Sequence, residues 1–422
     1  MNIGDIISVY INDMNENGVG ITRVDGAVVF VPSLVTGDTA DIRIVSREKN
    51  FFTAEVVEIK SPSPYRIQPV CKSANCGGCS LCHVTYEHEN AIKKNTVKNA
   101  FRRNGLPHDI VEDTVFSPDR MGYRNKLTVH YSKPARSFGL YANGTNDVIP
   151  FSSCVICPEI MSEIVRFTNE NIGLLEDVNP HTLCIRTDSD GKVTVSVYSG
   201  KLCNIDDYKS ALLNRFDAVL NVVLIIEGCG GCFIHDCIKG IDMRFSSEAF
   251  RQVNHDAFEL LLGVVHDMAK DSEFDCMADL YCGSGVIGLT LAKAFPGVKL
   301  YGIEINPDAV SDAKYNAAAN ELDNIEFFCG DSASFKKRIG KNQLPQLIVV
   351  DPPRAGLSKE MRSGLAELSP REIIYVSCNP QTLARDVASL RSSGYEIERV
   401  VPVNMFPMTA HCECVVSLKR RI

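Results

Sequence analysis

From about residue 241 onward, short apolar strand-like runs of this 422-residue chain alternate with helical segments. The strand-like runs include CMADLYC, KLYGIEI, IEFFCGD, QLIVVDPP and EIIYVSC, and segments such as VIGLTLAKAF and PDAVSDAKYNAAANEL separate them. Strands that alternate with helices pack as a mostly parallel sheet with helices on both faces. We therefore predict a doubly wound α/β domain over residues 241–422. In such sheets, ligands bind at the carboxyl ends of the strands.

The first 60 residues follow a different pattern. The runs IISVYIN, VVFVPS, TADIRIVSRE and FFTAEVVEIK alternate polar with β-branched residues, and turns separate them. This pattern predicts a small β-barrel, which could bind a partner or only pack or dimerise. The sequence Ser61-Pro62-Ser63-Pro64 then breaks the pattern and predicts a linker. We assign residues 61–240 to a central α+β segment.

Composition limits the environment of the chain. Hydrophobic residues make up 45% and charged residues 23%, which is normal for a globular protein. There is no run of about 18 apolar residues, so we expect no membrane span. The start MNIGDIISVY lacks the layout of a signal peptide, and we expect a cytoplasmic location. In a reducing compartment the 17 cysteines serve as buried thiols, metal ligands or a nucleophile rather than as disulfides.

Two basic segments in the central region could contact RNA. The segment AIKKNTVKNAFRRNG reads as a basic helix, and DRMGYRNKLTVHYSKPARSFGLY alternates basic with aromatic residues. Such a mixture suits phosphate contact and base stacking, although a solvated helix face is the common alternative. The net charge of −8 opposes RNA binding by the whole chain but not by a local basic surface. The candidates are Lys93, Lys94, Lys98, Arg102, Arg103, Tyr123, Tyr131, Phe138 and Tyr141.

A glycine-rich loop opens the α/β domain. Gly283-Ser284-Gly285-Val286-Ile287-Gly288 matches G-x-G-x-x-G, and Glu304 ends the second strand. The pattern is that of a dinucleotide site, in which the acid holds ribose hydroxyls. The same topology also serves S-adenosylmethionine. The loop alone does not separate the two cofactors.

Two further strand ends carry reactive groups that favour methyl transfer. Strand QLIVV ends in Asp351-Pro352-Pro353-Arg354, and strand EIIYV ends in Ser377-Cys378-Asn379-Pro380. A dehydrogenase has no evident use for a thiol at this edge, whereas a pyrimidine C5-methyltransferase has. Addition of a thiolate to C6 makes C5 nucleophilic enough to accept a methyl group. A base must then remove the C5 proton, and Glu413 is the best-placed candidate.

Taken together, these motifs resemble the RNA (uracil-5-)-methyltransferases, and specifically the ribosomal RNA type. The resemblance rests on Phe250 to Asn254, Asp279 to Gly285, Asp351 to Arg354, Ser377 to Pro380 and Phe406 to Glu413. It implies a Rossmann-like methyltransferase domain and an N-terminal OB-like, RNA-binding TRAM domain. It also implies Cys378 as nucleophile and Glu413 as base, with Arg354 positioning the uracil. The implied contacts to S-adenosylmethionine are Gln252, Tyr281, Glu304, Asp331 and Asp351. Val286 stands where family members often carry Asn, so that contact is not carried over.

The central cysteines point to a metal group. CKSANCGGCSLC is followed at a distance by FSSCVICP. By the resemblance, a [4Fe-4S] cluster is held by Cys71, Cys76, Cys79 and Cys154, and soft thiolates suit such a cluster. Cys157 stays open as the fourth ligand, and the repeated C-x2-C spacing, which includes Cys82, would also suit zinc. The pair Cys229 and Cys232 reads as a turn.

Several functions remain open at this point. The substrate implied by the resemblance is 23S ribosomal RNA, because transfer-RNA members generally lack both the barrel and the cysteine cluster. The alternatives are a tRNA uridine C5-methyltransferase, an NAD(P)-dependent oxidoreductase and a catalytically silent RNA-binding factor. We expect RNA as the partner, no membrane and no obligate protein partner.

Overall fold

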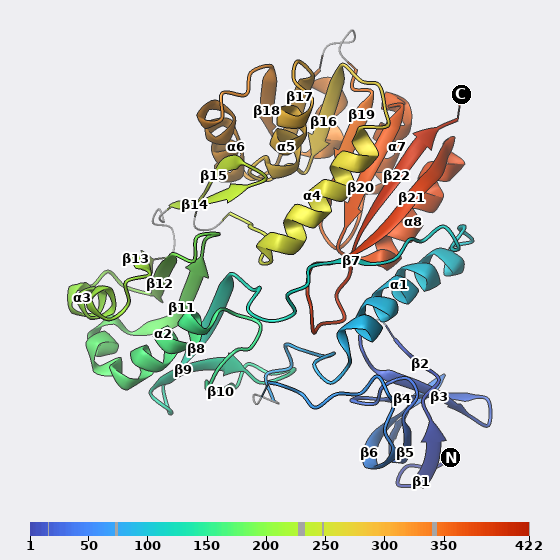
Figure 1. The fold of residues 1–422 in the computed structure, drawn as a ribbon, viewed down its shortest axis with the longest axis vertical. Helices are drawn as coiled ribbons and strands as arrows, with labels where there is room; N and C mark the ends of the chain where they lie inside the picture. Colours follow the sequence, from blue (N-terminus) through green and yellow to red (C-terminus); the bar gives the residue numbers. More distant parts are fainter. Residues whose placement is uncertain (16, 72–74, 227–232, 247–248, 340–343, 422) are drawn as a thin grey trace.

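The computed structural model describes residues 1–15, 17–71, 75–226, 233–246, 249–339 and 344–421. Its N-terminal part is a curled six-stranded sheet, drawn in blue in Figure 1, with the order β1-β5-β6-β4-β3-β2. The strands are β1 (Ile6–Tyr10), β2 (Asp13–Met14), β3 (Gly20–Val24), β4 (Ala27–Val31), β5 (Thr39–Arg47) and β6 (Phe51–Ser61). Asn12 N donates to Ile21 O at 3.0 Å, which links the end of β1 to β3. Buried alternating residues such as Val29 and Ile42 fill the interior, as the sequence pattern predicts.

The proline-rich segment after β6 is not a free linker. Ser63 is buried, and its backbone N–H donates to Asp38 Oδ1 at 2.8 Å. The guanidinium of Arg66 pairs with the other oxygen of the same carboxylate at 2.5 Å. The linker prediction is therefore wrong in this respect: the carboxylate of Asp38 fastens the segment to the N-terminal sheet.

The central part of the chain is a second six-stranded sheet with the order β10-β9-β8-β11-β12-β13. Its strands are β8 (Lys126–Ser132), β9 (Ser137–Tyr141), β10 (Val148–Pro150), β11 (Pro180–Thr187), β12 (Val193–Ser199) and β13 (Val219–Ile226). The helices α2 (Glu159–Glu170), η1 (Ile172–Val178) and α3 (Asp206–Arg215) accompany it. A two-stranded hairpin, β14 (Phe233–Ile238) and β15 (Ile241–Ser246), lies between this sheet and the C-terminal sheet in Figure 1.

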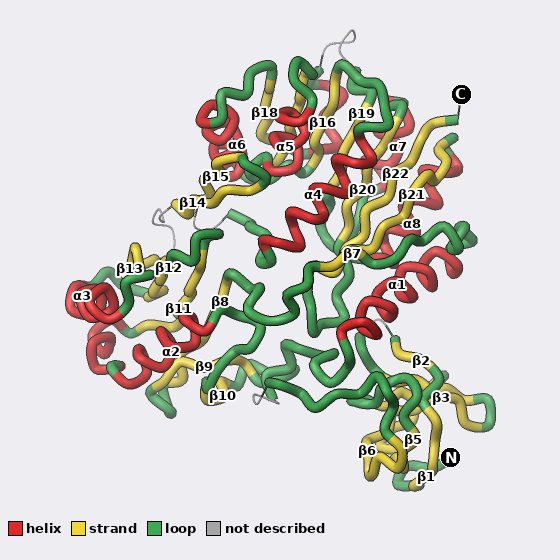
Figure 2. Tube along the Cα trace, viewed as in Figure 1, coloured by secondary structure: helices red, strands yellow, loops and turns green. Residues whose placement is uncertain are grey.

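The C-terminal sheet is the doubly wound sheet that the sequence predicts. Its order is β18-β17-β16-β19-β20-β22-β21-β7, and pairing is parallel from β18 to β20. The strands are β16 (Cys276–Leu280), β17 (Lys299–Glu304), β18 (Ile325–Cys329), β19 (Leu347–Val350), β20 (Glu372–Ser377), β21 (Tyr395–Asn404) and β22 (Glu413–Arg420). The helical elements are α4 (His255–Ala269), α5 (Val286–Ala294), α6 (Pro307–Ala319), η2 (Ser332–Lys337), α7 (Lys359–Leu368) and α8 (Pro380–Ser392). Figure 2 shows helices on both sides of these strands, and an apolar cluster covers each face.

One feature of this sheet differs from a dinucleotide fold. A six-stranded dinucleotide domain has the strand order 3-2-1-4-5-6, with the strands mostly parallel. Here β22 is inserted antiparallel between β20 and β21. As a result β22 begins, rather than ends, at the edge where the parallel strands end.

The basic helix of the central segment also belongs with this sheet. Helix α1 (Tyr86–Arg103) packs against α8 and β21, and its apolar side chains Val97, Ala100 and Phe101 join the C-terminal core. Strand β7 (Val115–Phe116) pairs with β21 as the last strand of the sheet. Figure 1 shows α1 between the N-terminal sheet and the C-terminal sheet. Among the described residues, no helix is long and apolar enough to cross a membrane.

Candidate active site

The predicted catalytic thiol lies at the carboxyl end of β20, where the chain turns directly into α8. Asn379 caps this helix by accepting from Gln381 N at 3.0 Å, and Pro380 occupies its first turn. The amide of Asn379 also donates to Arg354 O at 3.1 Å. The loops that follow β19 and β20 are thereby fastened to each other, with Cys378 between a strand end and a helix start.

The strand register brings Cys378 and Glu413 together. In the antiparallel pair β20–β22, Ser377 lies opposite Cys414, so the next position on each strand is Cys378 and Glu413. Residues opposite each other in such a pair have Cα atoms about 5 Å apart. Cys378 is half-buried and lines a pocket with Arg354 and His411. The thiol is therefore not sealed inside the fold.

The electrostatics of this pair suit proton transfer. Burial, with a smaller effect of the Asp351 charge, raises the pKa of Glu413 to about 8. Burial and the charges of Glu413 and Asp351 also raise the pKa of the Cys378 thiol, whereas the charge of Arg354 lowers both pKa values. A carboxyl group with a pKa near the working pH can act as a general base.

The glycine loop after β16 packs closely against its neighbours at the start of α5. Gly285 precedes α5 with a φ of +89°, a conformation that L side chains rarely adopt. A Cβ there would lie 3.2 Å from Ala313 Cβ. The carboxyl group of Asp279 accepts from Gly288 N at 2.8 Å. Burial raises the pKa of this carboxyl group to about 7.

Three of the five predicted cofactor contacts line one pocket beside this loop. Gln252, Tyr281 and Asp351 line it together with Gly283 and Ser284. Tyr281 is held at a φ of +68°, which turns the chain into the loop. Desolvation raises the pKa of the Asp351 carboxyl to about 7.

Glu304 and Asp331 are placed differently. The two carboxylate oxygens of Glu304 accept from Gly283 N at 3.1 Å and from Asn306 N at 2.8 Å. Glu304 therefore supports the glycine loop directly. Asp331 is exposed and accepts from Ala333 N at 2.9 Å at the start of η2. Burial raises the pKa of the Tyr281 phenol, and the charge of the nearby Asp331 raises it further.

Sequence reasoning missed several residues at these pockets. Asn17, on the turn after β2, and Thr96, on α1, line the same pocket as Cys378. Asp236 and His255 line the pocket that contains Gln252, Tyr281 and Asp351. Burial opposes ionisation of Asp236, but a hydrogen bond from His255 and the charge of Arg251 lower its pKa to about 2. A local motif could not reveal these residues because each comes from a different part of the fold.

Three of the four predicted cysteine ligands lie near one another. Cys76, Cys79 and Cys154 line one cavity of about 650 Å³ together with Cys157. Burial raises the pKa of Cys79 to about 12, and the charges of the neighbouring thiols, including Cys71 and Cys82, add to this effect. Within the described residues, however, no group of three or more His, Cys, Asp or Glu side chains takes a metal-binding arrangement. The pair at 229 and 232 lies outside the described residues.

Part of the predicted RNA-contact set is wrong. Lys93, Tyr123 and Phe138 are buried, so their side chains cannot meet RNA. The phenol of Tyr123 donates to Pro407 O at 2.9 Å, and Phe138 belongs to the apolar core of the central sheet. Tyr141 is partly exposed and stacks on His130 with 3.9 Å between ring centres. These aromatic residues alternate because they fill a sheet, and only some of them face outward.

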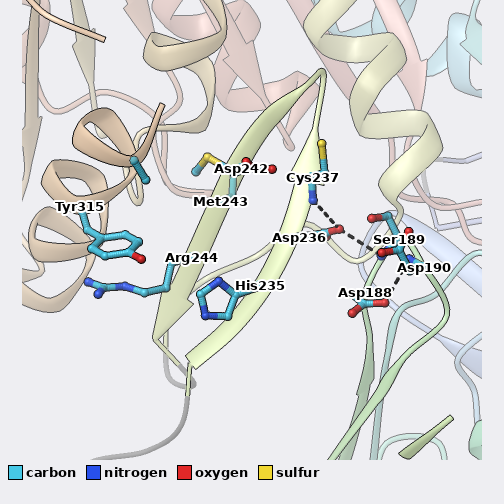
Figure 3. Close-up of a pocket in the computed structure, with 11 residues that line it drawn as sticks. Asp188, Ser189, Asp190, His235, Asp236, Cys237, Asp242, Met243, Arg244 and Tyr315 are labelled. Atoms are coloured by element: carbon cyan, nitrogen blue, oxygen red, sulfur yellow. Dashed lines mark hydrogen bonds between the residues drawn. The ribbon is translucent and has the colours of Figure 1, made fainter. Parts of the chain in front are cut away.

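A second polar hollow, of about 410 Å³, lies between β14–β15 and the loop that contains Ser189 (Figure 3). Asp188, Asp190 and Asp242 line it, and Ser189 N donates to Asp236 Oδ1 at 3.0 Å. Carboxylates repel the phosphates of a nucleic acid.

Comparison with known proteins identifies the family. Residues 237–421 match the family model described as tRNA (uracil-5-)-methyltransferase. A Bacillus cereus protein described as an uncharacterized RNA methyltransferase is 32% identical and covers 99% of this chain and 97% of its own. A Clostridium acetobutylicum protein with the same description is 32% identical, with 98% and 96% covered. The structure of Pyrococcus abyssi tRNA (uracil-54, C5)-methyltransferase in complex with S-adenosyl-L-homocysteine has a TM-score of 0.77 and 25% identity, with 98% of this chain and 100% of that chain covered. The chain belongs to the S-adenosylmethionine-dependent RNA (uracil-5-)-methyltransferase family.

Proposed function

We propose that this enzyme methylates C5 of a uridine through a covalent bond between Cys378 Sγ and C6 of the base. The observation that supports the proposal is the β20–β22 register, in which Ser377 lies opposite Cys414 and the next position on each segment is Cys378 and Glu413, together with the pocket that Cys378 lines with Arg354. Because the chain belongs to a methyltransferase family, the glycine loop no longer favours an NAD(P)-dependent oxidoreductase.

The chain's own residues would act in three steps. Cys378, as a thiolate favoured by Arg354, attacks C6 and makes C5 nucleophilic. Gln252, Tyr281, Glu304, Asp331 and Asp351 would hold S-adenosylmethionine, which would supply the methyl group to C5 and leave as S-adenosylhomocysteine. Glu413 then takes the C5 proton, the C5–C6 double bond reforms and the Cys378 thiolate leaves.

The experiment is methyl transfer to RNA with nucleoside analysis of the product. The purified enzyme is expected to form 5-methyluridine, and Cys378→Ala is expected to form none while it still binds S-adenosylmethionine. Methylation by Cys378→Ala, or a product methylated elsewhere than C5, would overturn the proposal. RNA binding without any methylation by the wild type would favour the silent factor.

We propose 23S ribosomal RNA as the substrate, on the resemblance of the barrel and the cysteine-rich segment to the ribosomal type. Transfer RNA is the second candidate: the tRNA enzyme of Pyrococcus abyssi matches 98% of this chain and 100% of its own, so the barrel and the cysteine-rich segment do not by themselves exclude a tRNA substrate. Mapping of 5-methyluridine in a deletion strain separates the two. Loss of the mark from 23S RNA is expected, and loss from tRNA alone would reverse the assignment.

We further propose that Cys71, Cys76, Cys79 and Cys154 hold a [4Fe-4S] cluster, with zinc as the alternative. The support is chemical: thiols are the ligands that such a cluster takes, and three of the four line one cavity. Its role is structural, since methyl transfer needs no electron. Anaerobically purified protein should contain about four iron and four sulfide per chain, whereas about one zinc without iron would favour the alternative.

A further inference from the structure

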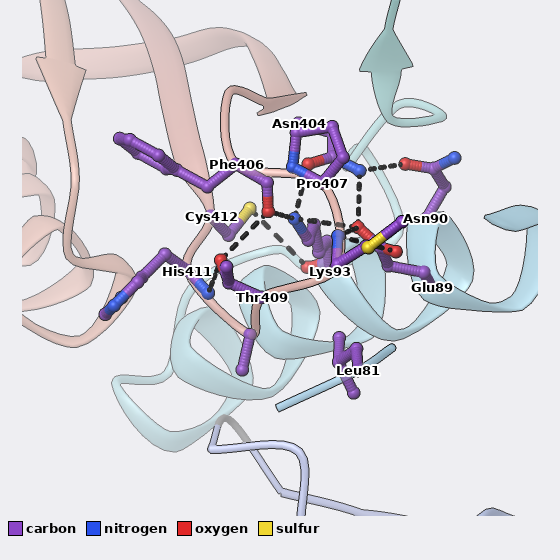
Figure 4. Close-up of polar contacts among 12 residues, drawn as sticks. Leu81, Glu89, Asn90, Lys93, Asn404, Phe406, Pro407, Thr409, His411 and Cys412 are labelled. Carbon is purple, nitrogen blue, oxygen red and sulfur yellow. Dashed lines mark hydrogen bonds and ion pairs between the residues drawn. The ribbon is translucent and has the colours of Figure 1, made fainter. Parts of the chain in front are cut away.

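A buried charged junction joins α1 to the connection between β21 and β22 (Figure 4). Glu89 and Lys93 are both fully buried, and Lys93 Nζ lies 3.2 Å from Glu89 Oε1. The ammonium group donates to Asn404 Oδ1 and, at 2.9 Å, to Phe406 O. A lysine at this depth is rare unless it is paired, and here two of its partners belong to the connection 404–412.

Glu89 binds the same connection from the other side. Its carboxylate accepts from Asn404 Nδ2 at 2.9 Å and from Met408 N at 3.0 and 3.1 Å. Arg120 donates to it at 3.0 Å, so the carboxylate is shared among an amide, a backbone N–H and two cations. Hydrogen bonds to charged groups are stronger and more directional than neutral ones. Apolar packing alone would not fix the connection in this way.

The junction lies next to Glu413 in the fold. Asn404 ends β21, and in the β21–β22 pair Val403 lies opposite Glu413. The thiol of Cys412, just before Glu413, contacts Lys93 O at 3.9 Å. Both ends of the connection are therefore fastened to α1, and so is its middle at Phe406 and Met408.

The cysteine-rich segment takes part in the same arrangement. Arg120 donates to Leu81 O at 3.0 Å and to Val84 O at 2.7 Å. Leu81 N in turn donates to Met408 O at 2.8 Å. The connection before Glu413 is thus held between α1 and the cysteine-rich segment at Leu81.

We propose that Glu89, Lys93 and Asn404 are positioning residues that hold Glu413 against the reacting C5 atom. The inference rests on the proposed function, because it assigns the junction to the step in which Glu413 removes the C5 proton. It predicts a defect confined to that step: the bond between Cys378 and C6 still forms, and its release is slow.

The test uses two variants and one double variant of the full chain. Lys93→Met removes the donor to Asn404 and Phe406. Asn404→Asp keeps an acceptor for Lys93 but sets a second carboxylate against Glu89. In the combination of Asn404→Asp with Glu89→Gln, the amide and the carboxylate exchange places. The new amide on α1 can then donate to the new carboxylate at the end of β21 while its oxygen still accepts from Met408 N. Lys270→Met, at an exposed pair with Asp267, is the matched control.

The readouts are tritium release from RNA that carries [5-³H]uridine and the amount of covalent adduct on a denaturing gel. Lys93→Met and Asn404→Asp should slow tritium release at least about tenfold and accumulate adduct, because a displaced base loses part of its catalytic effect. The KM for RNA should not change. The double variant should recover to within about threefold of the wild type, since its two substitutions are coupled.

Each outcome decides the matter. Wild-type tritium release in Asn404→Asp, or no recovery in the double variant, would overturn the inference. So would an equal loss of adduct formation and release in Lys93→Met together with a lower melting temperature, because that result means a purely structural role. If the wild type itself forms no adduct with natural or fluorinated RNA, the proposed function fails instead.

Discussion

Replacement of Glu413 by Gln should make the protein more stable while it stops turnover. The Glu413 side chain is only 4% exposed, and its pKa is raised from 4.5 to about 8. At pH 7 the unfolded chain carries this carboxyl ionised, so folding must bind a proton to it. Over the pH interval from 4.5 to 7, this proton uptake lowers the free energy of unfolding by about 3 kcal/mol. The amide in the Glu413→Gln variant binds no proton on folding, and the free energy of unfolding should rise by about that amount.

The pH dependence makes this prediction specific. Below pH 4.5 the carboxyl group is protonated in both the folded and the unfolded wild type, and its contribution to stability is fully present. This contribution is lost as the pH rises from 4.5 towards 8, because the unfolded chain then ionises first. Glu413→Gln and the wild type should therefore be equally stable near pH 4.5, diverge as the pH rises and differ by about 5 kcal/mol above pH 8. Urea unfolding followed by circular dichroism measures this difference, since the chain has no tryptophan to report by fluorescence.

The same variant should lose about 10²- to 10⁴-fold in the rate of tritium release, the usual contribution of a general base. It should also accumulate the covalent adduct. Parallel pH profiles for the stability of the two proteins would refute the reasoning, because Glu413 would then ionise as freely in the fold as in the unfolded chain.

Further variants probe the thiol, the glycine loop and the arginine. Cys378→Ala should abolish methylation and leave the dissociation constant for S-adenosylmethionine unchanged by calorimetry; a tenfold change would place the thiol in cofactor binding. Gly285→Ala, with its Cβ 3.2 Å from Ala313 and a φ of +89°, should weaken cofactor binding and destabilise the fold by about 1–3 kcal/mol, and an unchanged affinity would contradict the role of the loop. Arg354→Met removes a charge that lowers the pKa of Cys378. The pH profile of adduct formation should therefore move to higher pH, and an unmoved profile would mean that the guanidinium does not act on the thiol.

The sequence predicts the parallel part of the C-terminal sheet because its strands and helices alternate without interruption. It does not predict that β22 runs antiparallel between β20 and β21, since both directions give the same apolar pattern. That insertion brings Glu413 to the edge where Cys378 follows the end of β20. A motif search finds both residues, whereas only the register explains their proximity.

The basic helix shows where pattern reasoning fails. Lys93 and Lys94 are neighbours in a charged run, yet Lys94 pairs with Asp113 near the surface and Lys93 is fully buried. Its charged partner Glu89 lies one helical turn away, but Asn404, which also accepts from its ammonium group, is 311 residues away in the chain. A helix that packs against a distant strand can bury a charge only where that strand supplies a partner. Such a partner is not visible in the local sequence.

The most direct test of the account is to trap the enzyme with RNA that contains 5-fluorouridine and to identify the modified peptide by mass spectrometry. Fluorine cannot leave C5 as a cation, so Glu413 cannot complete the reaction and the adduct persists. The account predicts one adduct in the presence of S-adenosylmethionine, attached to Cys378. Attachment to any other of the 17 cysteines, or bound RNA without an adduct, would contradict it.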